Sequence, residues 1–176
     1  MKNEAMEKNE QGQLVTFYLG RELYGIEIYK IQEVLHFREI TRIPNAPEFV
    51  DGVIEVRDRV IPVVDLKRRL RVKDEASGKR RLLILDLADR PLGVIVDDIS
   101  HVLAVSASQY EPLPESVKGE NGEGCIARLA RAGSRLIIVI SPEHILTRQE
   151  RKQLQDLDRP VRTEPTDVEP VHGLAG

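Results

Sequence analysis

Two stretches of the chain share one pattern of apolar and polar positions. Residues 15–35 (VTFYLGRELYGIEIYKIQEVL) and 83–103 (LILDLADRPLGVIVDDISHVL) align without a gap at an offset of 68 residues. Apolar residues fall on apolar residues, and Gly25 falls on Gly93. Each stretch alternates apolar and polar residues up to a polar turn and back, which is typical of a β-hairpin. The pattern predicts a repeated unit: a hairpin, one helical turn and a further strand.

A second pair of segments completes the repeat. Residues 52–70 resemble 124–146, and the second copy is four residues longer, a difference that we assign to its hairpin tip. In each copy two apolar strands are followed by a short helix, with Asp65 or Ser141 as its expected N-cap. Short strands with frequent turns are typical of barrels and sandwiches. We therefore expect an all-β chain built from two five-stranded, mostly antiparallel units with short helices.

Three charged residues, Arg57, Asp58 and Arg59, interrupt the apolar segment 52–66. A two-residue hairpin turn needs positive φ angles, which Gly adopts easily and Asp tolerates. We predict that Asp58 lies in the turn and that Arg57 shares a strand face with Glu55 and Arg59. Arg57 then has two interpretations, a surface ion pair with Glu55 or a polar hot spot for a partner.

Composition and charge narrow the class of function. The 176 residues are 41% hydrophobic but only 4% aromatic, so the core must be aliphatic. The formal net charge of −3 and the few aromatics disfavour nucleic acid as a partner, although a small nucleic-acid-binding barrel stays the alternative because of the basic stretches 67–71 and 79–81. No apolar run reaches the roughly 20 residues that span a bilayer. We expect residues 1–13 to be a flexible arm, and residues 147–176 to hold a helix end and a disordered tail.

The chain offers no reactive constellation. Cys125 is its single cysteine, which excludes a Cys-based zinc site, and the four histidines are scattered. Ser100 and His101 lie near two aspartates, but no G-x-S-x-G elbow and no phosphate-binding glycine loop is present. We expect a binding protein, not an enzyme, with no metal and no cofactor.

Four motifs follow one another between residues 14 and 146: YGIEIYKIQEVL (24–35), TRIPNAPEFVDGVIEVRDRVIPVVDL (41–66), LGVIVDDISHVL (92–103) and LIIVISPEHIL (136–146). In this order and spacing they resemble the CheW family of bacterial chemotaxis coupling proteins. The resemblance implies a CheW-like domain over 14–146 with two SH3-like five-stranded β-barrel subdomains, roughly 14–70 and 81–146. An exchange of terminal strands between the subdomains is left open.

The resemblance also implies a function. CheW-like proteins are non-catalytic cytoplasmic adaptors at membrane-associated receptor arrays, without direct membrane insertion. They bind the regulatory domain of the histidine kinase CheA and the cytoplasmic tip of chemoreceptors. The family motif Asn-Leu-Arg-Gly stands here as Glu55-Val56-Arg57-Asp58, so its Arg is kept and its Gly is replaced. Carried over by motif, the receptor-binding residues are Ile31, Glu33, Val34 and Arg57, and the kinase-binding residues are Leu92, Gly93 and Ile99.

Overall fold

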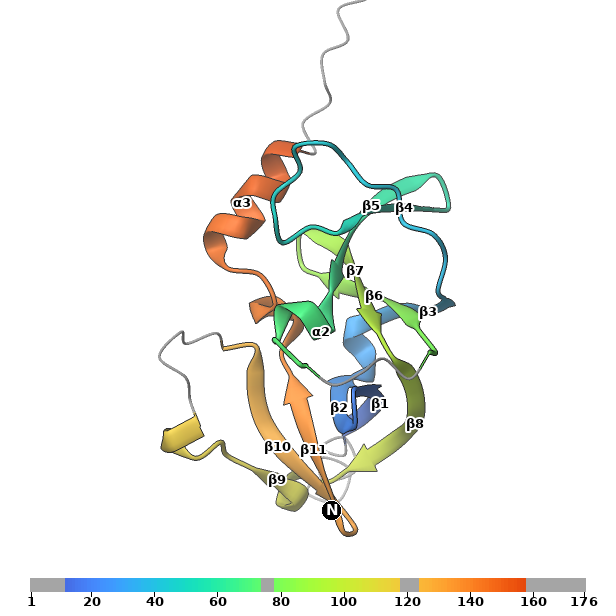
Figure 1. The fold of residues 1–176 in the computed structure, drawn as a ribbon. Helices are drawn as coiled ribbons and strands as arrows, with labels where there is room; N and C mark the ends of the chain where they lie inside the picture. Colours follow the sequence, from blue (N-terminus) through green and yellow to red (C-terminus); the bar gives the residue numbers. More distant parts are fainter. Residues whose placement is uncertain (1–11, 74–77, 118–123, 158–176) are drawn as a thin grey trace, which may run out of the picture. The chain divides into compact units, whose positions relative to one another are not determined.

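The computed structural model describes residues 12–73, 78–117 and 124–157 (Figure 1). The chain divides into two units, Met1–Leu146 and Thr147–Gly176. In the described part of the first unit, eleven strands form two sheets. The expected arm and tail fall largely on residues 1–11 and 158–176, which lie outside the described residues.

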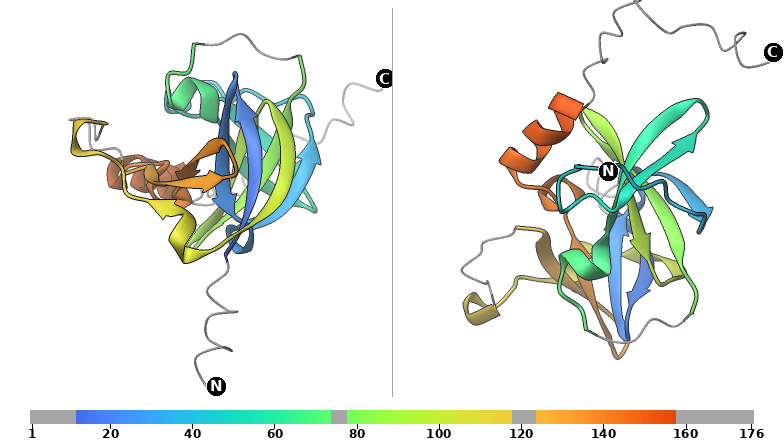
Figure 2. Two further views of the ribbon diagram at one scale, coloured as in Figure 1. Left: turned by 90° about the horizontal axis from the view of Figure 1, so that it is seen from below. Right: turned by 45° about the horizontal axis from the view of Figure 1, so that its top comes forward.

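The six-stranded sheet combines strands from the beginning and the end of the first unit (Figure 1 and Figure 2). Its order is β8-β1-β2-β11-β10-β9, and all neighbours are antiparallel except β2 and β11. The bounds are β1 (Gly12–Leu19), β2 (Glu22–Glu27), β8 (Asp98–Val105), β9 (Tyr110–Glu111), β10 (Ile126–Ala132) and β11 (Arg135–Ile140). Since β9 has only two residues, it is a small addition to the five strands expected from the sequence.

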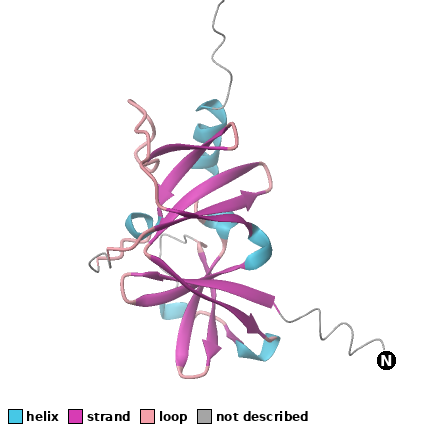
Figure 3. Ribbon diagram, turned by 90° about the vertical axis from the view of Figure 1, so that its right-hand side faces the viewer, coloured by secondary structure: helices cyan, strands magenta, loops and turns pink. Residues whose placement is uncertain are grey.

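The five-stranded sheet has the order β3-β6-β7-β5-β4, in which only β5 and β7 are parallel neighbours. The bounds are β3 (Ile31–His36), β4 (Gly52–Val56), β5 (Arg59–Asp65), β6 (Arg81–Leu87) and β7 (Arg90–Val96). Figure 3 shows the strands gathered in two groups. The predicted all-β class is confirmed.

Each sheet has its own aliphatic core. One cluster contains Leu14, Leu23, Val105, Ala130, Ile137 and Val139 from the six-stranded sheet, and the other contains Ile54, Ile61, Val63, Leu82, Ile84 and Ile95 from the five-stranded sheet. Full burial of one such large aliphatic side chain contributes about 1.5–3 kcal/mol. The cores need no tryptophan and few aromatic rings, as the composition predicted.

Short helices connect the strands: η1 (Ile28–Lys30), α2 (Leu66–Arg69), η2 (Ala107–Gln109), η3 (Glu115–Val117) and η4 (Pro142–His144). The Asp65 carboxylate caps α2 by accepting hydrogen bonds from the amides of Lys67 and Arg68, as predicted. Ser141 does not cap η4 with its side chain, because its hydroxyl donates to the Glu143 carboxylate. In the second unit, α3 (Arg148–Leu157) begins with reciprocal hydrogen bonds between Thr147 and Glu150.

The 68-residue offset corresponds to a repeated order of elements. The hairpin β1–β2 and the strand β3 match the hairpin β6–β7 and the strand β8. In each copy the third strand pairs with the hairpin of the other copy: β3 pairs with β6, and β8 pairs with β1. Both sheets therefore take strands from both expected subdomains, 14–70 and 81–146, while the bounds of these subdomains stay a prediction.

The two glycines of the repeat occupy equivalent environments. Gly25 lies opposite the parallel strand β11, and a Cβ atom there would lie 3.1 Å from the Ile137 side chain. Gly93 lies opposite the parallel strand β5, and a Cβ atom there would lie 3.1 Å from the Val63 side chain. Both positions favour glycine because a Cβ atom at this distance would crowd the neighbouring strand.

The β4–β5 and β10–β11 hairpins both have two-residue tips. The extra residues of the second copy therefore do not lie at its tip, which corrects the assignment from sequence. All four precede the tip: β10 has seven residues where β4 has five, and Gly124 and Cys125 come before β10. The register of β10 also shifts between Ile126 and Arg128.

Candidate partner-binding surface

β3 and β8 are edge strands of their sheets, and they are equivalent in the repeat. Each carries an exposed valine at the same repeat position: Val34 is 45% exposed on β3 and Val102 is 52% exposed on β8. Both strands lie on the same side of the unit in Figure 1 and in the left view of Figure 2. We call Val34 and Val102, with the half-buried Ile31 of β3, the edge-strand surface. Exposed aliphatic side chains are typical of docking sites when they cluster.

The side chains of Arg57 and Glu33 form an ion pair. The Nη2 atom of Arg57 lies 3.3 Å from the Oε1 atom of Glu33. Arg57 is 81% exposed, so most of its guanidinium group faces solvent. An exposed pair of this kind contributes only about 0–1 kcal/mol to stability. The structure thus brings together two of the four residues predicted to bind the receptor, Glu33 and Arg57. Val34 follows Glu33 on β3 with its side chain on the opposite face of the strand, and Ile31 begins the same strand.

The turn places Arg57 differently from the prediction. Arg57 and Asp58 form the two-residue turn with φ angles of 50° and 63°, so the expectation that Asp58 lies in the turn is confirmed. The expectation that Arg57 shares a strand face with Glu55 and Arg59 is wrong, because Arg57 is a turn residue itself. Its partner is Glu33, which is distant in sequence, and not the expected Glu55.

Two of the three predicted kinase-binding residues belong to the core. Leu92 has no exposed surface, and Gly93 is buried inside β7 between β5 and β6. Neither offers an exposed side chain at the surface of the chain, so a kinase contact at this side of the molecule would depend on their neighbours. Ile99 is half-buried on the edge strand β8 and is the one residue of this set with accessible side-chain surface.

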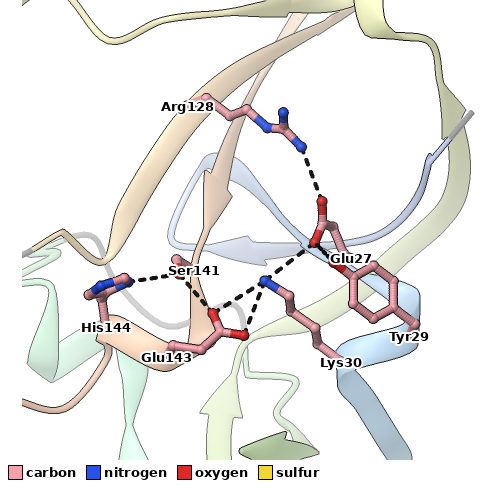
Figure 4. Close-up of polar contacts among 7 residues, drawn as sticks. All are labelled: Glu27, Tyr29, Lys30, Arg128, Ser141, Glu143 and His144. Carbon is pink, nitrogen blue, oxygen red and sulfur yellow. Dashed lines mark hydrogen bonds and ion pairs between the residues drawn. The ribbon is translucent and has the colours of Figure 1, made fainter. Parts of the chain in front are cut away.

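A network of charged and polar side chains connects β2, η1, β10 and η4 (Figure 4). The Nζ atom of Lys30 lies 3.2 Å from both carboxylate oxygens of Glu143 and 3.3 Å from Glu27 Oε2. Glu27 also accepts hydrogen bonds from Arg128 at 3.0 Å and from the Tyr29 hydroxyl at 2.5 Å. We call these five residues, with Ser141, the Lys30 cluster.

The pKa values of the cluster follow from its contacts. Burial alone would raise the pKa of Glu27, but the hydrogen bonds from Tyr29 and Lys30 and the nearby positive charges outweigh it and lower the pKa. Burial of Glu143 is likewise outweighed by hydrogen bonds from the backbone, Ser141 and Lys30, so its pKa is lowered. Burial would lower the pKa of Lys30, but the two carboxylates raise it. Both acids and the lysine are therefore charged near neutral pH.

Sequence reasoning missed several residues of this region. Val102 could have been found, because the repeat aligns it with Val34. Tyr29, which is 73% exposed, gives no local signal that separates it from a core aromatic residue. Lys30 and Glu143 are 113 residues apart, so their contact depends on the tertiary fold alone.

The remaining candidate chemistry has structural explanations. In the described ranges no group of three or more His, Cys, Asp and Glu side chains is placed to hold a metal ion. Cys125 is buried. Lys67 and Arg68 of the basic stretch form ion pairs with Asp97 at 3.1 Å and Asp51 at 2.8 Å, which removes support for a nucleic-acid site there. None of the described helices has the length and apolar character needed to cross a membrane.

The chain is an all-β protein whose two sheets exchange strands. Its exposed edge strands and its exposed Arg57–Glu33 ion pair suit the binding of other proteins. The family model of the CheW-like domain matches residues 13–150. The chemotaxis protein CheW of Treponema pallidum is 34% identical over 154 residues, covering 85% of this chain and 90% of that protein. The CheW protein of Klebsiella aerogenes is 32% identical over 139 residues, covering 78% of this chain and 83% of its own length.

A solved structure supports the same assignment. The scaffolding protein TtCheW of Thermoanaerobacter tengcongensis matches with a TM-score of 0.71 and 30% identity, over 78% of this chain and 88% of that one. The chain belongs to the CheW-like domain family. Members of this family are non-catalytic scaffold proteins of chemotaxis signalling.

Proposed function

We propose that the edge-strand surface binds the cytoplasmic tip of a chemoreceptor. The observation that carries this proposal is the pair of equivalent exposed valines, Val34 and Val102, on the two edge strands. An amphipathic helix docks its apolar side chains into such an accessible aliphatic surface. The chemoreceptor tips that CheW-like proteins bind are helical, so they suit this mode of binding.

We assign the ion pair of Arg57 and Glu33, on the face of β3 opposite to Val34, to the polar rim of the proposed interface. Arg is enriched at binding hot spots because its planar group makes several directed hydrogen bonds. The Glu33 contact uses one nitrogen of Arg57, and the 81% exposure of the side chain leaves the other donors accessible to a partner. A receptor residue with a carboxylate or a backbone carbonyl would suit these donors.

The regulatory domain of CheA is the second proposed partner. Its contact is assigned to the start of β8, where Ile99 is accessible, while Leu92 and Gly93 support the fold of β7 from the core. With both partners bound, the chain would hold kinase and receptor in one cytoplasmic array. No nucleic acid takes part in this proposal.

Val34→Glu tests the receptor surface. The charge on β3 should weaken binding of a purified receptor-tip fragment by about 2 kcal/mol or more if Val34 is a hot spot. Leu136→Glu is the matched control, because Leu136 is 41% exposed on β11, outside the edge-strand surface. Equal receptor affinity of the two variants, with unchanged melting temperatures, would contradict the proposal.

A further inference from the structure

Lys30 stands at the junction from one sheet to the other. It is the last residue of η1, which follows β2 of the six-stranded sheet, and the next residue begins β3 of the five-stranded sheet. Its side chain is only 20% exposed and contacts Glu27 at the end of β2 and Glu143 in η4. η1 and η4 both contact β6, the strand with which β3 pairs.

The two carboxylates around Lys30 are themselves held in place. Glu27 is fixed by Arg128 of β10, whose guanidinium group also stacks 3.6 Å above the centre of the Tyr110 ring. Glu143 accepts the Ser141 hydroxyl at 2.8 Å. Lys30 is thus bound to acceptors that other elements have already oriented, as Figure 4 shows. Partly buried, hydrogen-bonded pairs of this kind restrict side-chain geometry more than exposed pairs do.

β3 needs such a restraint at its start. As an edge strand it is held by backbone hydrogen bonds along one side, where it pairs with β6. Its register shifts between Ile31 and Glu33, directly after Lys30. A shift of this kind bends a strand and disrupts its ladder locally. The contacts of Lys30 therefore fix the point from which Ile31 and Val34 are presented.

The repeat provides a second example of the same device. At the offset of 68 residues, Lys30 corresponds to Asp98, the first residue of β8. Asp98 lies 3.9 Å from the Lys79 ammonium group and 4.0 Å from the Arg81 guanidinium group. Each exchanged strand thus has an ion-paired residue at its start or immediately before it, Asp98 at the start of β8 and Lys30 before β3. The two residues have opposite charges, and the pairing is closer at Lys30.

We propose that Lys30 is a positioning residue for receptor binding: its contacts with Glu27 and Glu143 hold the start of β3 so that Ile31 and Val34 meet the receptor tip. This inference rests on the proposed function, because it assumes that β3 contacts the receptor. Lys30 itself need not touch the partner. Loss of its charge would loosen β3 relative to β6 while the cores of both sheets remain packed.

Lys30→Met in the full-length chain tests the inference, because Met keeps an unbranched stem and removes the charge. Amide hydrogen exchange should become faster along β3 and stay unchanged along β10 and β11. Affinity for a purified receptor-tip fragment should fall by about tenfold. Lys30→Arg should restore both properties, and Lys152→Met, at an exposed position of α3, should change neither.

The outcomes separate the inference from the proposed function. Unchanged exchange along β3 in Lys30→Met would overturn the inference, whatever the receptor affinity. Faster exchange in every strand of both sheets would also overturn it, since Lys30 would then serve global stability. Glu143→Gln, which keeps the shape of the partner, should reproduce the local effect on β3. Failure of the wild-type chain to bind the receptor tip would instead contradict the proposed function, and the exchange data would still report on β3.

Discussion

Arg57 and Glu33 reach each other from opposite edges of the five-stranded sheet. Glu33 lies on β3 at one edge, and Arg57 lies in the turn that follows β4 at the other, yet their side chains approach to 3.3 Å. Arg38, just beyond β3, donates a hydrogen bond to the backbone oxygen of Glu55 on β4. The sheet therefore curls until its two edges meet, and the polar rim of the edge-strand surface lies at this closure.

Arg57→Ala should separate the binding role of the pair from its structural role. The free energy of unfolding should change by less than about 1 kcal/mol, because the pair is exposed. Receptor binding should weaken by about 2 kcal/mol or more, as expected for an Arg hot spot. Denaturant titration and calorimetric binding to a receptor-tip fragment measure the two effects, with the exposed Arg59→Ala as control. A variant that unfolds, or one that binds like the wild type, would contradict this role.

Asp58→Gly should stabilise the fold slightly. Asp58 has a φ angle of 63°, a conformation that glycine adopts without the steric cost of a Cβ atom. We expect a gain of up to about 1 kcal/mol in the free energy of unfolding. Asp89→Gly is the control, because Asp89 lies in the β6–β7 turn and is not among the described residues with positive φ. A loss of stability in Asp58→Gly would show that the Asp58 side chain matters more than its backbone conformation.

Val102→Glu should weaken receptor binding as Val34→Glu does. The two valines occupy equivalent positions on β8 and β3, and both are about half exposed, so neither substitution removes a core side chain. Melting temperatures should therefore stay close to that of the wild type. Isothermal titration with the receptor-tip fragment measures the effect. If only Val34→Glu loses affinity, the receptor contacts β3 alone, and the surface does not extend to β8.

The Lys30 cluster should make the free energy of unfolding depend on pH in the acid range, where Glu27 and Glu143 become protonated. The pKa values of Glu27 and Glu143 are lower in the folded chain than the usual 4.5, so their contribution is complete above this pH. It is lost as the pH falls through their folded-state pKa values. Lys30 has a raised pKa, so its own contribution is complete below 10.5 and is lost only at more alkaline pH.

Lys30→Met provides the measurement for this pH dependence. The difference in the free energy of unfolding between wild type and Lys30→Met should be largest near neutral pH and should shrink as Glu27 and Glu143 become protonated. Urea titrations at a series of pH values report this difference. A difference that stays constant into the acid range would mean that the cluster is not ionised as described.

Local sequence patterns predicted the parts of the fold that depend on local geometry. The hairpins, the turn at Asp58 and the cap at Asp65 follow from alternation and turn chemistry, and the shared glycines marked the repeat. The exchange of β3 and β8 was left open, because alternation identifies a strand but not its neighbour. The burial of Leu92 and Gly93 was not foreseen for a related reason: a strand buried on both faces gives the same apolar run as a strand with an accessible edge.

The ion-pair partner of Arg57 also could not be identified from local sequence alternation. Alternation suggested Glu55, two residues away, whereas the positive φ of Arg57 directs its side chain out of the strand pattern towards Glu33. Only the curled sheet brings these residues together. The Lys30 cluster, which joins residues from β2, β10 and η4, could not be read from the sequence for the same reason.

The central claim is that one chain holds receptor and kinase at the same time, with the receptor contact centred on β3 and the kinase contact on the start of β8. Analytical ultracentrifugation of the purified chain with a receptor-tip fragment and the CheA regulatory domain tests it most directly. The account predicts that the wild-type chain forms a ternary complex with both partners. The Val34→Glu variant should form a complex with the CheA domain alone. Competition between the two partners for wild type, or loss of both partners in a folded Val34→Glu variant, would contradict the account.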